Sequence, residues 1–179
     1  GQKDLKILLI DFNLDNPNIN LYYSFVDPNR NLGAIIDDVE RGKTLTSKNL
    51  EQYLITHPVY SNLKILPGAI LKMKKRDPEF MFAIFEKIIE VGEQNNFSTI
   101  LIDTQAGLDE LTTNILRKVS KIILHIKETP GSLNAMYRCF DTEAGPFVEK
   151  LIDRRKMIPI ITESYNDTQT NVKRAVHGF

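Results

Sequence analysis

Short apolar runs recur along the chain and alternate with helical or polar stretches. The first run, Leu5 to Ile10, is too short for a helix and stops at Asp11, which predicts a strand covered on both faces. Strands of this kind belong to parallel sheets, and their alternation with helical patterning predicts an α/β fold. We therefore expect a layered, mostly parallel sheet with helices on both faces. The later runs that we predict as strands are residues 63–66, 97–103, 122–126 and 158–161.

Helix-start and helix-stop residues frame the segments between these runs. Asp77 is a good N-cap, Pro78 suits the first helical position, and an apolar stripe follows until Gly92. Asn31 in the same way predicts a helix that ends near Gly42. The other predicted helices are a short one that Ser47 caps and that runs through Tyr53, and three more over residues 108–119, 132–140 and 146–152.

Composition narrows the classes of protein. At 179 residues the chain has the size of one domain, and we expect residues 1–179 to form a single domain with a substantial core. Acidic and basic residues balance at 23 each, so no overall field favours nucleic acid. No apolar run approaches the roughly 20 residues that a membrane-spanning helix needs. The single cysteine, Cys139, cannot form an internal disulfide, which fits the cytoplasm.

Two aspartates that end predicted strands are the first candidates for chemistry. Asp103 is followed by a turn of small residues, and Asp11 is followed by a polar segment around Pro17. If the strands are parallel, both carboxylates lie at one edge of the sheet, where two acids make a pair that handles Mg²⁺ and water. The alternative is that the two aspartates only cap the turns that follow them.

The histidines and the charged segments suggest no further functional site. His125 lies inside an apolar run, where we expect a core residue, and the three histidines are too scattered to suggest a zinc site. The basic residues between 72 and 76 are expected to form a solvated loop. Residues 172–179 have the pattern of a short amphipathic helix that packs on the sheet.

Five segments resemble, in order and spacing, the MinD/ParA class of deviant P-loop ATPases, and within it the MinD and CpaE/TadZ branches. The resemblance covers residues 6–137, and the order of the segments carries it because no single motif is decisive. It implies a P-loop NTPase-like fold and a protein that positions division sites, flagella or pili. The segments read KILLIDFNLDNPNINLYYSF, NLGAIIDDVERG, NLKILPG, FSTILIDTQAGLDE and KIILHIKETPGSLNAMYR.

The resemblance assigns roles to particular residues. Asp11 matches the first acid of the family's D-x-D strand end, which contacts the metal-bound water and the γ-phosphate region. Asn13 falls where the second acid organises the attacking water, and Asp103 matches the Walker B aspartate that holds Mg²⁺ through water. The expected nucleotide-facing residues are Thr104, Gln105, Ala106 and Gly107 in the switch turn, and Thr129 and Pro130 after the next strand.

The chain departs from the family's pattern at three places. Asn13 can orient water but cannot accept its proton, so any hydrolysis should be slow. Gln105 replaces the proline that is usual in the D-x-P-A-G turn. Glu163 and Ser164 stand where the family has a base-reading Asn-Arg pair, which puts adenine recognition in doubt.

The largest departure is the missing P-loop, which the family places one strand and one helix upstream of Asp11. Residues 41–44 contain Gly-Lys-Thr, but they follow a predicted helix, and Asp37 stands where the first glycine of the motif belongs. The P-loop strand of the family lies beside the Walker B strand, so its loss would unpair buried backbone groups at about 1–3 kcal/mol each. We expect that the chain is part of a longer ATPase, incomplete at its N-terminus, or that another segment or partner closes the sheet.

The resemblance implies a MinD/ParA-like spatial regulator or partitioning ATPase. Its complete form is expected to use ATP and Mg²⁺, to form a homodimer, and to act in the cytoplasm or at the membrane periphery with cell-pole, membrane, pilus or flagellar machinery. Residues 1–179 alone are expected to bind ATP weakly or not at all and to be inactive as an ATP hydrolase. Two alternatives stay open: a non-catalytic docking or scaffold module of the same fold, and a receiver-like signalling domain.

Overall fold

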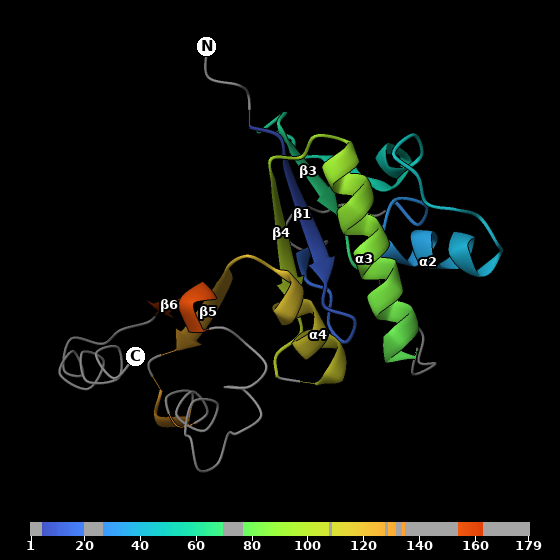
Figure 1. Cartoon of the computed structure of the whole chain (residues 1–179). Coiled ribbons are helices and arrows are strands. Elements are labelled where there is room, and N and C mark those ends of the chain that lie inside the picture. The colour runs from blue at the N-terminus through green and yellow to red at the C-terminus, as the bar shows by residue number, and fades with distance from the viewer. Residues whose placement is uncertain are drawn as a thin grey trace. The chain divides into compact units, whose positions relative to one another are not determined.

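The computed structural model describes residues 5–19, 27–69, 77–107, 109–127, 129–131, 134 and 154–162. The chain divides into two compact units, residues 1–112 and 113–179, and each is considered by itself. The strands of the first unit are β1 (Ile7–Phe12), β2 (Ile55–Thr56), β3 (Leu63–Leu66) and β4 (Thr99–Thr104). They form one sheet in the order β2-β3-β1-β4, in which β1 pairs in parallel with both β3 and β4, and β2 adds an antiparallel edge (Figure 1).

The strands predicted for this unit are present, with small shifts at their ends. β3 occupies the predicted residues, whereas β1 begins and ends slightly later than expected. Asp11 and Asp103 therefore lie inside their strands, because the ladder between β1 and β4 continues through this pair to Phe12 and Thr104. β2 has no counterpart in the prediction, since two residues are too few to show an alternating pattern.

Two α-helices of this unit begin at the predicted caps. The side chain of Asn31 accepts a hydrogen bond from the N–H of Ala34 and opens α2 (Leu32–Glu40). Asp77 accepts from two backbone N–H groups and opens α3 (Pro78–Gln94). The predicted stop at Gly92 is wrong, because α3 continues to Gln94 and the chain reverses only at the next residues. Gly92 instead lets α3 approach the sheet closely: a Cβ there would lie 3.0 Å from Cδ1 of Ile100.

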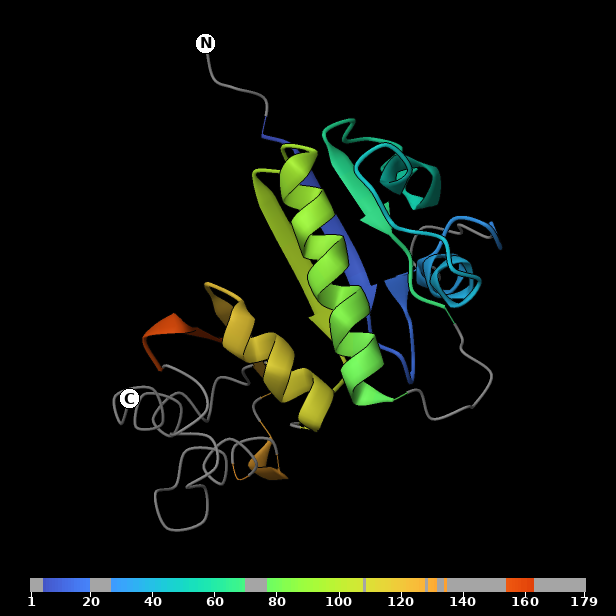
Figure 2. The ribbon, with the colours of Figure 1, turned by 45° about the vertical axis from the view of Figure 1, so that its right-hand side comes forward.

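The core of the first unit lies between α3 and one face of the sheet (Figures 1 and 2). Alternate residues of β1, namely Leu8, Ile10 and Phe12, are buried on this face. The ring of Phe12 meets the ring of Phe85 on α3 edge to face, with centroids 5.7 Å apart. Each such side chain stabilises the fold by about 1.5–3 kcal/mol when fully buried. This packing holds β1 rigidly at the centre of the sheet.

The short helix predicted from Ser47 is a single 3₁₀ turn, η1 (Leu50–Tyr53), and the predicted cap is wrong. Asn49 is the residue before η1, and its side chain caps nothing in the turn. It instead braces the preceding loop, accepting from the N–H of Thr46 at 2.7 Å and donating to the carbonyl of Thr44 at 3.0 Å. The loop conformation therefore decides where the turn starts.

The second unit contains a pair of parallel strands, β5 (Ile122–Lys127) and β6 (Met157–Thr162), both close to their predicted ranges. The predicted helix at 108–119 corresponds to α4 (Glu110–Lys118), which crosses the boundary between the units, and a 3₁₀ turn, η2 (Arg154–Lys156), precedes β6. The predicted helices at 132–140 and 146–152, the basic cluster at 72–76, Cys139 and residues 163–179 lie outside the described residues, except for residue 134.

The prediction that His125 belongs to the core is wrong, because its side chain is exposed. It pairs in register with Ile160 on β6, and the same face carries Ile123 and Ile158, which are also exposed. Two strands cannot cover their own faces, so the apolar pattern of β5 does not bury this residue in the described part of the second unit.

The mostly parallel sheet with its helices confirms the predicted fold class. Within the described part of the chain, no helix combines the length and the apolar character needed to cross a bilayer.

Candidate functional site

The two predicted acids lie side by side at the carboxyl ends of β1 and β4. Asp11 and Asp103 are register partners in the parallel ladder, so their side chains leave the same face of the sheet. The sequence-based expectation that both acids meet at one edge agrees with this pairing. The carboxyl edge of a parallel sheet is where ligands of open α/β folds bind.

The surroundings of the two carboxylates differ sharply. Asp11 is 0% exposed, whereas Asp103 is exposed to solvent. Burial raises the pKa of Asp11, hydrogen bonds from backbone N–H groups oppose this rise, and the nearby charge of Asp103 adds to it. Desolvation by the surrounding protein also raises the pKa of Asp103. Asp103 is therefore the member of the pair whose oxygens can reach a ligand from solvent.

Backbone N–H groups hold the carboxylate of Asp11. Its Oδ1 accepts from the N–H of Asn13 at 3.2 Å, and its Oδ2 accepts from the N–H of Ile19 at 3.1 Å. The N–H of Gly68, just after β3, also hydrogen bonds to it. For Asp11, the alternative that it caps the following turn is thus part of its observed role, and the prediction named neither Ile19 nor Gly68.

The side chain of Asn13 is engaged in the same loop. Its Oδ1 accepts from the N–H of Asn16 at 3.0 Å, which closes a second tight turn directly after the first. The segment from Asp11 to Ile19 is therefore a sequence of side-chain-capped turns. Asp11 and Asn13, the two residues expected to handle water, thus both accept backbone hydrogen bonds within this loop.

The predicted switch turn follows β4 directly. Gly107 has φ +108°, a left-handed conformation that favours glycine, and a Cβ there would meet nothing within 4 Å. Gln105 donates from Nε2 to Oδ2 of Asp109, whose Oδ1 accepts from the N–H of Thr112 at 2.7 Å. Asp109 thus caps the start of α4, a role that the N-cap preference for aspartate could have signalled. Thr104, directly after Asp103, is the last residue of β4, and Ala106 lies in the turn that follows.

Thr129 and Pro130 belong to the second unit. Both are exposed, and the N–H of Thr129 donates to the carbonyl of Lys127 at 2.8 Å. They follow the carboxyl end of β5, as predicted. Glu163 and Ser164 lie outside the described residues.

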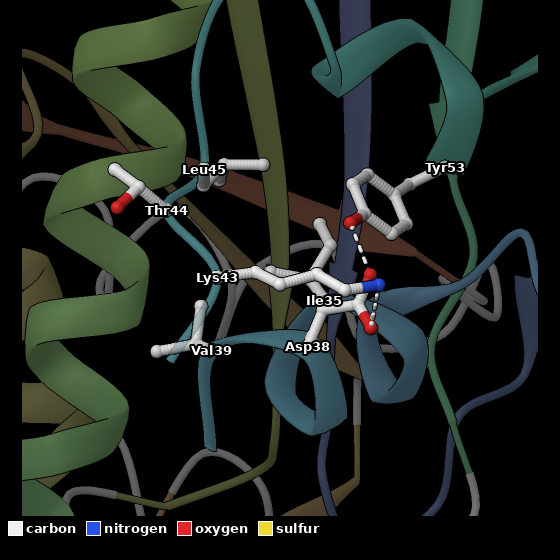
Figure 3. Close-up of a pocket in the computed structure, with 7 residues that line it drawn as sticks. All are labelled: Ile35, Asp38, Val39, Lys43, Thr44, Leu45 and Tyr53. Carbon is white, nitrogen blue, oxygen red and sulfur yellow. Dashed lines mark hydrogen bonds and ion pairs between the residues drawn. The ribbon is translucent and has the colours of Figure 1, made fainter. Parts of the chain in front are cut away.

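The Gly-Lys-Thr segment serves the fold. It follows α2, and Nζ of Lys43 donates to Oδ1 of Asp38 at 2.9 Å. The hydroxyl of Tyr53 donates to the other oxygen of Asp38 at 2.8 Å, and the bonds from Lys43 and Tyr53 lower the pKa of Asp38. Figure 3 shows the small pocket around this cluster, which its own side chains fill. The residues that line it are Ile35, Asp38, Val39, Lys43, Thr44, Leu45 and Tyr53.

The carboxyl edge fits a magnesium ion better than it fits a triphosphate. Mg²⁺ usually takes one or two carboxylates and completes its shell with water and phosphate oxygens. Asp103 offers one such exposed carboxylate, and among the described residues no group of three or more His, Cys, Asp or Glu could hold a metal. Phosphates need a lysine or a glycine-rich loop, and Lys43, the lysine of the Gly-Lys-Thr segment, is engaged with Asp38.

Comparisons with known proteins place the fold. No protein-family model matches the chain, and no curated protein matches it in sequence. Among solved structures it is similar to a ParA family ATPase from Chlorobium tepidum TLS, with a TM-score of 0.70 and 15% identity over 98% of this chain and 70% of that one. It is also similar to the MinD cell division protein of Aquifex aeolicus, with a TM-score of 0.64 and 20% identity over 96% of this chain and 64% of that one.

A third similar structure is the septum site-determining protein MinD from Pyrococcus horikoshii OT3, complexed with Mg-ADP. The TM-score is 0.51 and the identity 22%, over 78% of this chain and 54% of that one. The chain thus spans between 54% and 70% of the length of these three proteins. At these identities the similarity establishes the fold, which is that of ParA and MinD ATPases.

Proposed function

We propose that the chain is part of a MinD/ParA-type ATPase that positions or partitions cellular cargo. The observation that carries the proposal is the register pairing of Asp11 with Asp103 at the carboxyl edge of a sheet with the ParA and MinD fold. Nucleotide hydrolases of this fold class place an acid at that edge beside the phosphates. A homodimer, and a cell-pole, membrane, pilus or flagellar partner, stay predictions of the family resemblance.

The residues take the following roles in this proposal. Asp103 would hold Mg²⁺ through water, and the backbone of Thr104 to Gly107 would face the γ-phosphate. Asp11 and Asn13 belong to the part of the site that handles the attacking water. Bound Mg²⁺ would neutralise phosphate charge. Hydrolysis is slow because an amide at position 13 cannot accept a proton. That Thr129 and Pro130 face the nucleotide stays a prediction of the family resemblance.

The edge position of β4 in the sheet supports the expectation that the site is incomplete in residues 1–179. β4 pairs with β1 on one side, and on its other side it has no partner strand among the described residues. Proteins usually cover or pair such an apolar strand edge. A strand that carries the phosphate-binding loop, supplied from outside residues 1–179, would cover it.

Calorimetry tests the proposal directly. We expect no micromolar binding of Mg-ATP to residues 1–179, and Mg²⁺-dependent binding to a full-length protein that contains them. Asp103→Asn in the full-length protein should weaken the Mg²⁺-dependent part by at least about tenfold, since a charged ligand becomes neutral. Micromolar, Mg²⁺-dependent binding to residues 1–179 alone would contradict the expected incompleteness.

A docking or scaffold module of the same fold is the second candidate. It is favoured by the hydrogen bonds of Asp11 and Asn13, whose side-chain oxygens serve the loop that follows β1. A full-length protein that contains residues 1–179 and neither binds nor hydrolyses ATP would establish this candidate over the ATPase.

A further inference from the structure

The carboxylate of Asp11 joins three separate segments of the first unit. It belongs to β1, and its hydrogen-bond donors come from the loop after β1 and from the turn after β3. We call this arrangement the carboxylate clasp; it consists of the side chain of Asp11 and the N–H groups of Asn13, Ile19 and Gly68. Figure 1 shows the loop leaving the carboxyl end of β1.

The clasp depends on a glycine at position 68. A Cβ on Gly68 would lie 2.5 Å from Cβ of Pro17 and 2.8 Å from Cγ of Asp11, and real Cβ atoms do not approach other atoms this closely. Only glycine therefore lets the turn after β3 close over the carboxylate and over the loop at once. Gly68 and Pro17 cannot move apart easily to make room for a Cβ, because both residues are buried.

A buried carboxylate held in this way has a fixed position. Its burial is compensated by charge-assisted hydrogen bonds from backbone N–H groups, and rotating it toward a ligand would leave those donors unpaired. Asp103, its register partner, is exposed, and within the described part of the chain no group hydrogen bonds to its carboxylate. The two acids thus differ in what they can contact.

We propose that Asp11 is a positioning residue whose carboxylate holds the loop of residues 13–19 in place and so fixes Asn13 at the carboxyl edge of the sheet. Gly68 is the second positioning residue, because it gives the carboxylate room to do so. Asp103 alone of the two acids contacts the metal. The part of the proposal that concerns the metal and water rests on the proposed ATPase function, and the part that concerns the loop does not.

Amide hydrogen exchange tests the loop. Asp11→Asn replaces one acceptor oxygen with an N–H₂ group that faces a backbone donor, so exchange at residues 13–19 should accelerate by about tenfold or more. Gly68→Ala should accelerate the same amides by forcing the turn away. Asp15→Asn makes the same charge change on an exposed side chain of this loop, and Gly131→Ala adds a Cβ where nothing lies within 4 Å, so neither should have this effect.

ATP turnover by the full-length protein tests whether Asp11 affects hydrolysis by positioning Asn13. We expect Asp11→Asn to lower kcat for ATP by about tenfold while KM for Mg-ATP changes little. If Asp11 acts only by placing Asn13, the double variant Asp11→Asn with Asn13→Ala should be no slower than Asn13→Ala alone. Variants that unfold are recognised by circular dichroism, and Gly68→Ala then carries the test in place of Asp11→Asn.

The outcomes separate the two proposals. Unchanged exchange at residues 13–19 in both Asp11→Asn and Gly68→Ala would overturn the clasp. A loss of Mg²⁺ affinity in Asp11→Asn as large as that in Asp103→Asn would overturn it as well, because Asp11 would then be a metal ligand. Accelerated exchange in a full-length protein without ATPase activity would support the clasp and reject the proposed function.

Discussion

The neighbouring strands β1 and β4 have similar apolar sequences but different surroundings. β1 pairs with strands on both sides and lies under α3, so Leu8 and Ile10 are 0% exposed. β4 pairs on one side among the described residues, and Leu101, the register partner of Leu9 on the face of the sheet opposite to Leu8 and Ile10, is 43% exposed. An apolar run therefore predicts a strand, whereas the burial of that strand's side chains depends on which elements pack against it.

The strongest test of this difference compares Leu8→Ala with Leu101→Ala in residues 1–179. Removing Leu8 opens a cavity in a closed core and should lower the free energy of unfolding by about 2–5 kcal/mol. Removing Leu101 takes away a side chain that is already partly in water, so less than about 1 kcal/mol is expected. Urea unfolding measures both values.

Two results would break the comparison. A cost for Leu101→Ala as large as that for Leu8→Ala would mean that β4 is covered in solution. If further segments of the full-length protein cover this face of β4, the cost of Leu101→Ala should rise there toward that of Leu8→Ala, and an unchanged small cost would count against such a cover.

The pair Asp11 and Asp103 extends the comparison to the strand ends. Desolvation raises both folded-state pKa values above the ordinary 3.8, so folding favours the protonated forms. The contribution of each group is most favourable below pH 3.8 and is lost as the pH rises through the raised value. Asp103→Asn removes one charge of the pair and should stabilise the chain at pH 7 by less than about 1 kcal/mol, because Asp103 is exposed.

Unfolding curves at several pH values measure this effect. The gain in Asp103→Asn should disappear below pH 3.8, where Asp103 is protonated in both the folded and the unfolded state. Asp15→Asn serves as the control, because it changes the same charge in an exposed position of the loop. A gain that stays constant across this pH range would show that the charge of the Asp103 carboxylate is not its source.

Local signals in the sequence predicted most of the first unit. Asn31 and Asp77 are side-chain acceptors directly before apolar stripes, and both cap helices as predicted. The prediction that Gly92 ends a helix is wrong because a glycine inside a helix also serves close packing, which depends on Ile100 in another element. Sequence patterns carry no information on such distant contacts.

In the candidate site, too, local features could be predicted from the sequence and long-range contacts could not. The strand pattern correctly placed Asp11 beside Asp103, since both end short apolar runs. The contact between Asp11 and Gly68 could not be predicted from the sequence, because the two residues are far apart in the chain. Predicting it requires knowing the conformation of the turn after β3. His125 was misplaced for a related reason: its neighbours on β6 leave that face open.

The smallest predicted effect concerns how β4 is tied to the start of β1. Nζ of Lys6 lies 4.4 Å from the centre of the Phe97 ring and donates to the carbonyl of Asn95 at 3.3 Å. It also forms an ion pair with Glu51 at 3.3 Å, which the ion pair of the control variant below matches. Lys6→Met keeps the aliphatic stem and removes the charge, so we expect a loss of about 0.5–1 kcal/mol. Thermal unfolding detects a change of this size.

Lys87→Met is the matched control for this substitution. Lys87 forms an ion pair with Glu90 at 2.8 Å on the surface of α3, three residues apart, and exposed pairs of this kind contribute less than about 0.5 kcal/mol. A larger loss in Lys6→Met than in Lys87→Met would show that the cation stabilises the link from α3 into β4. Equal losses would mean that the backbone ladder with β1, together with the hydrogen bond from the N–H of Ser98 to the carbonyl of Lys6, is sufficient to hold β4.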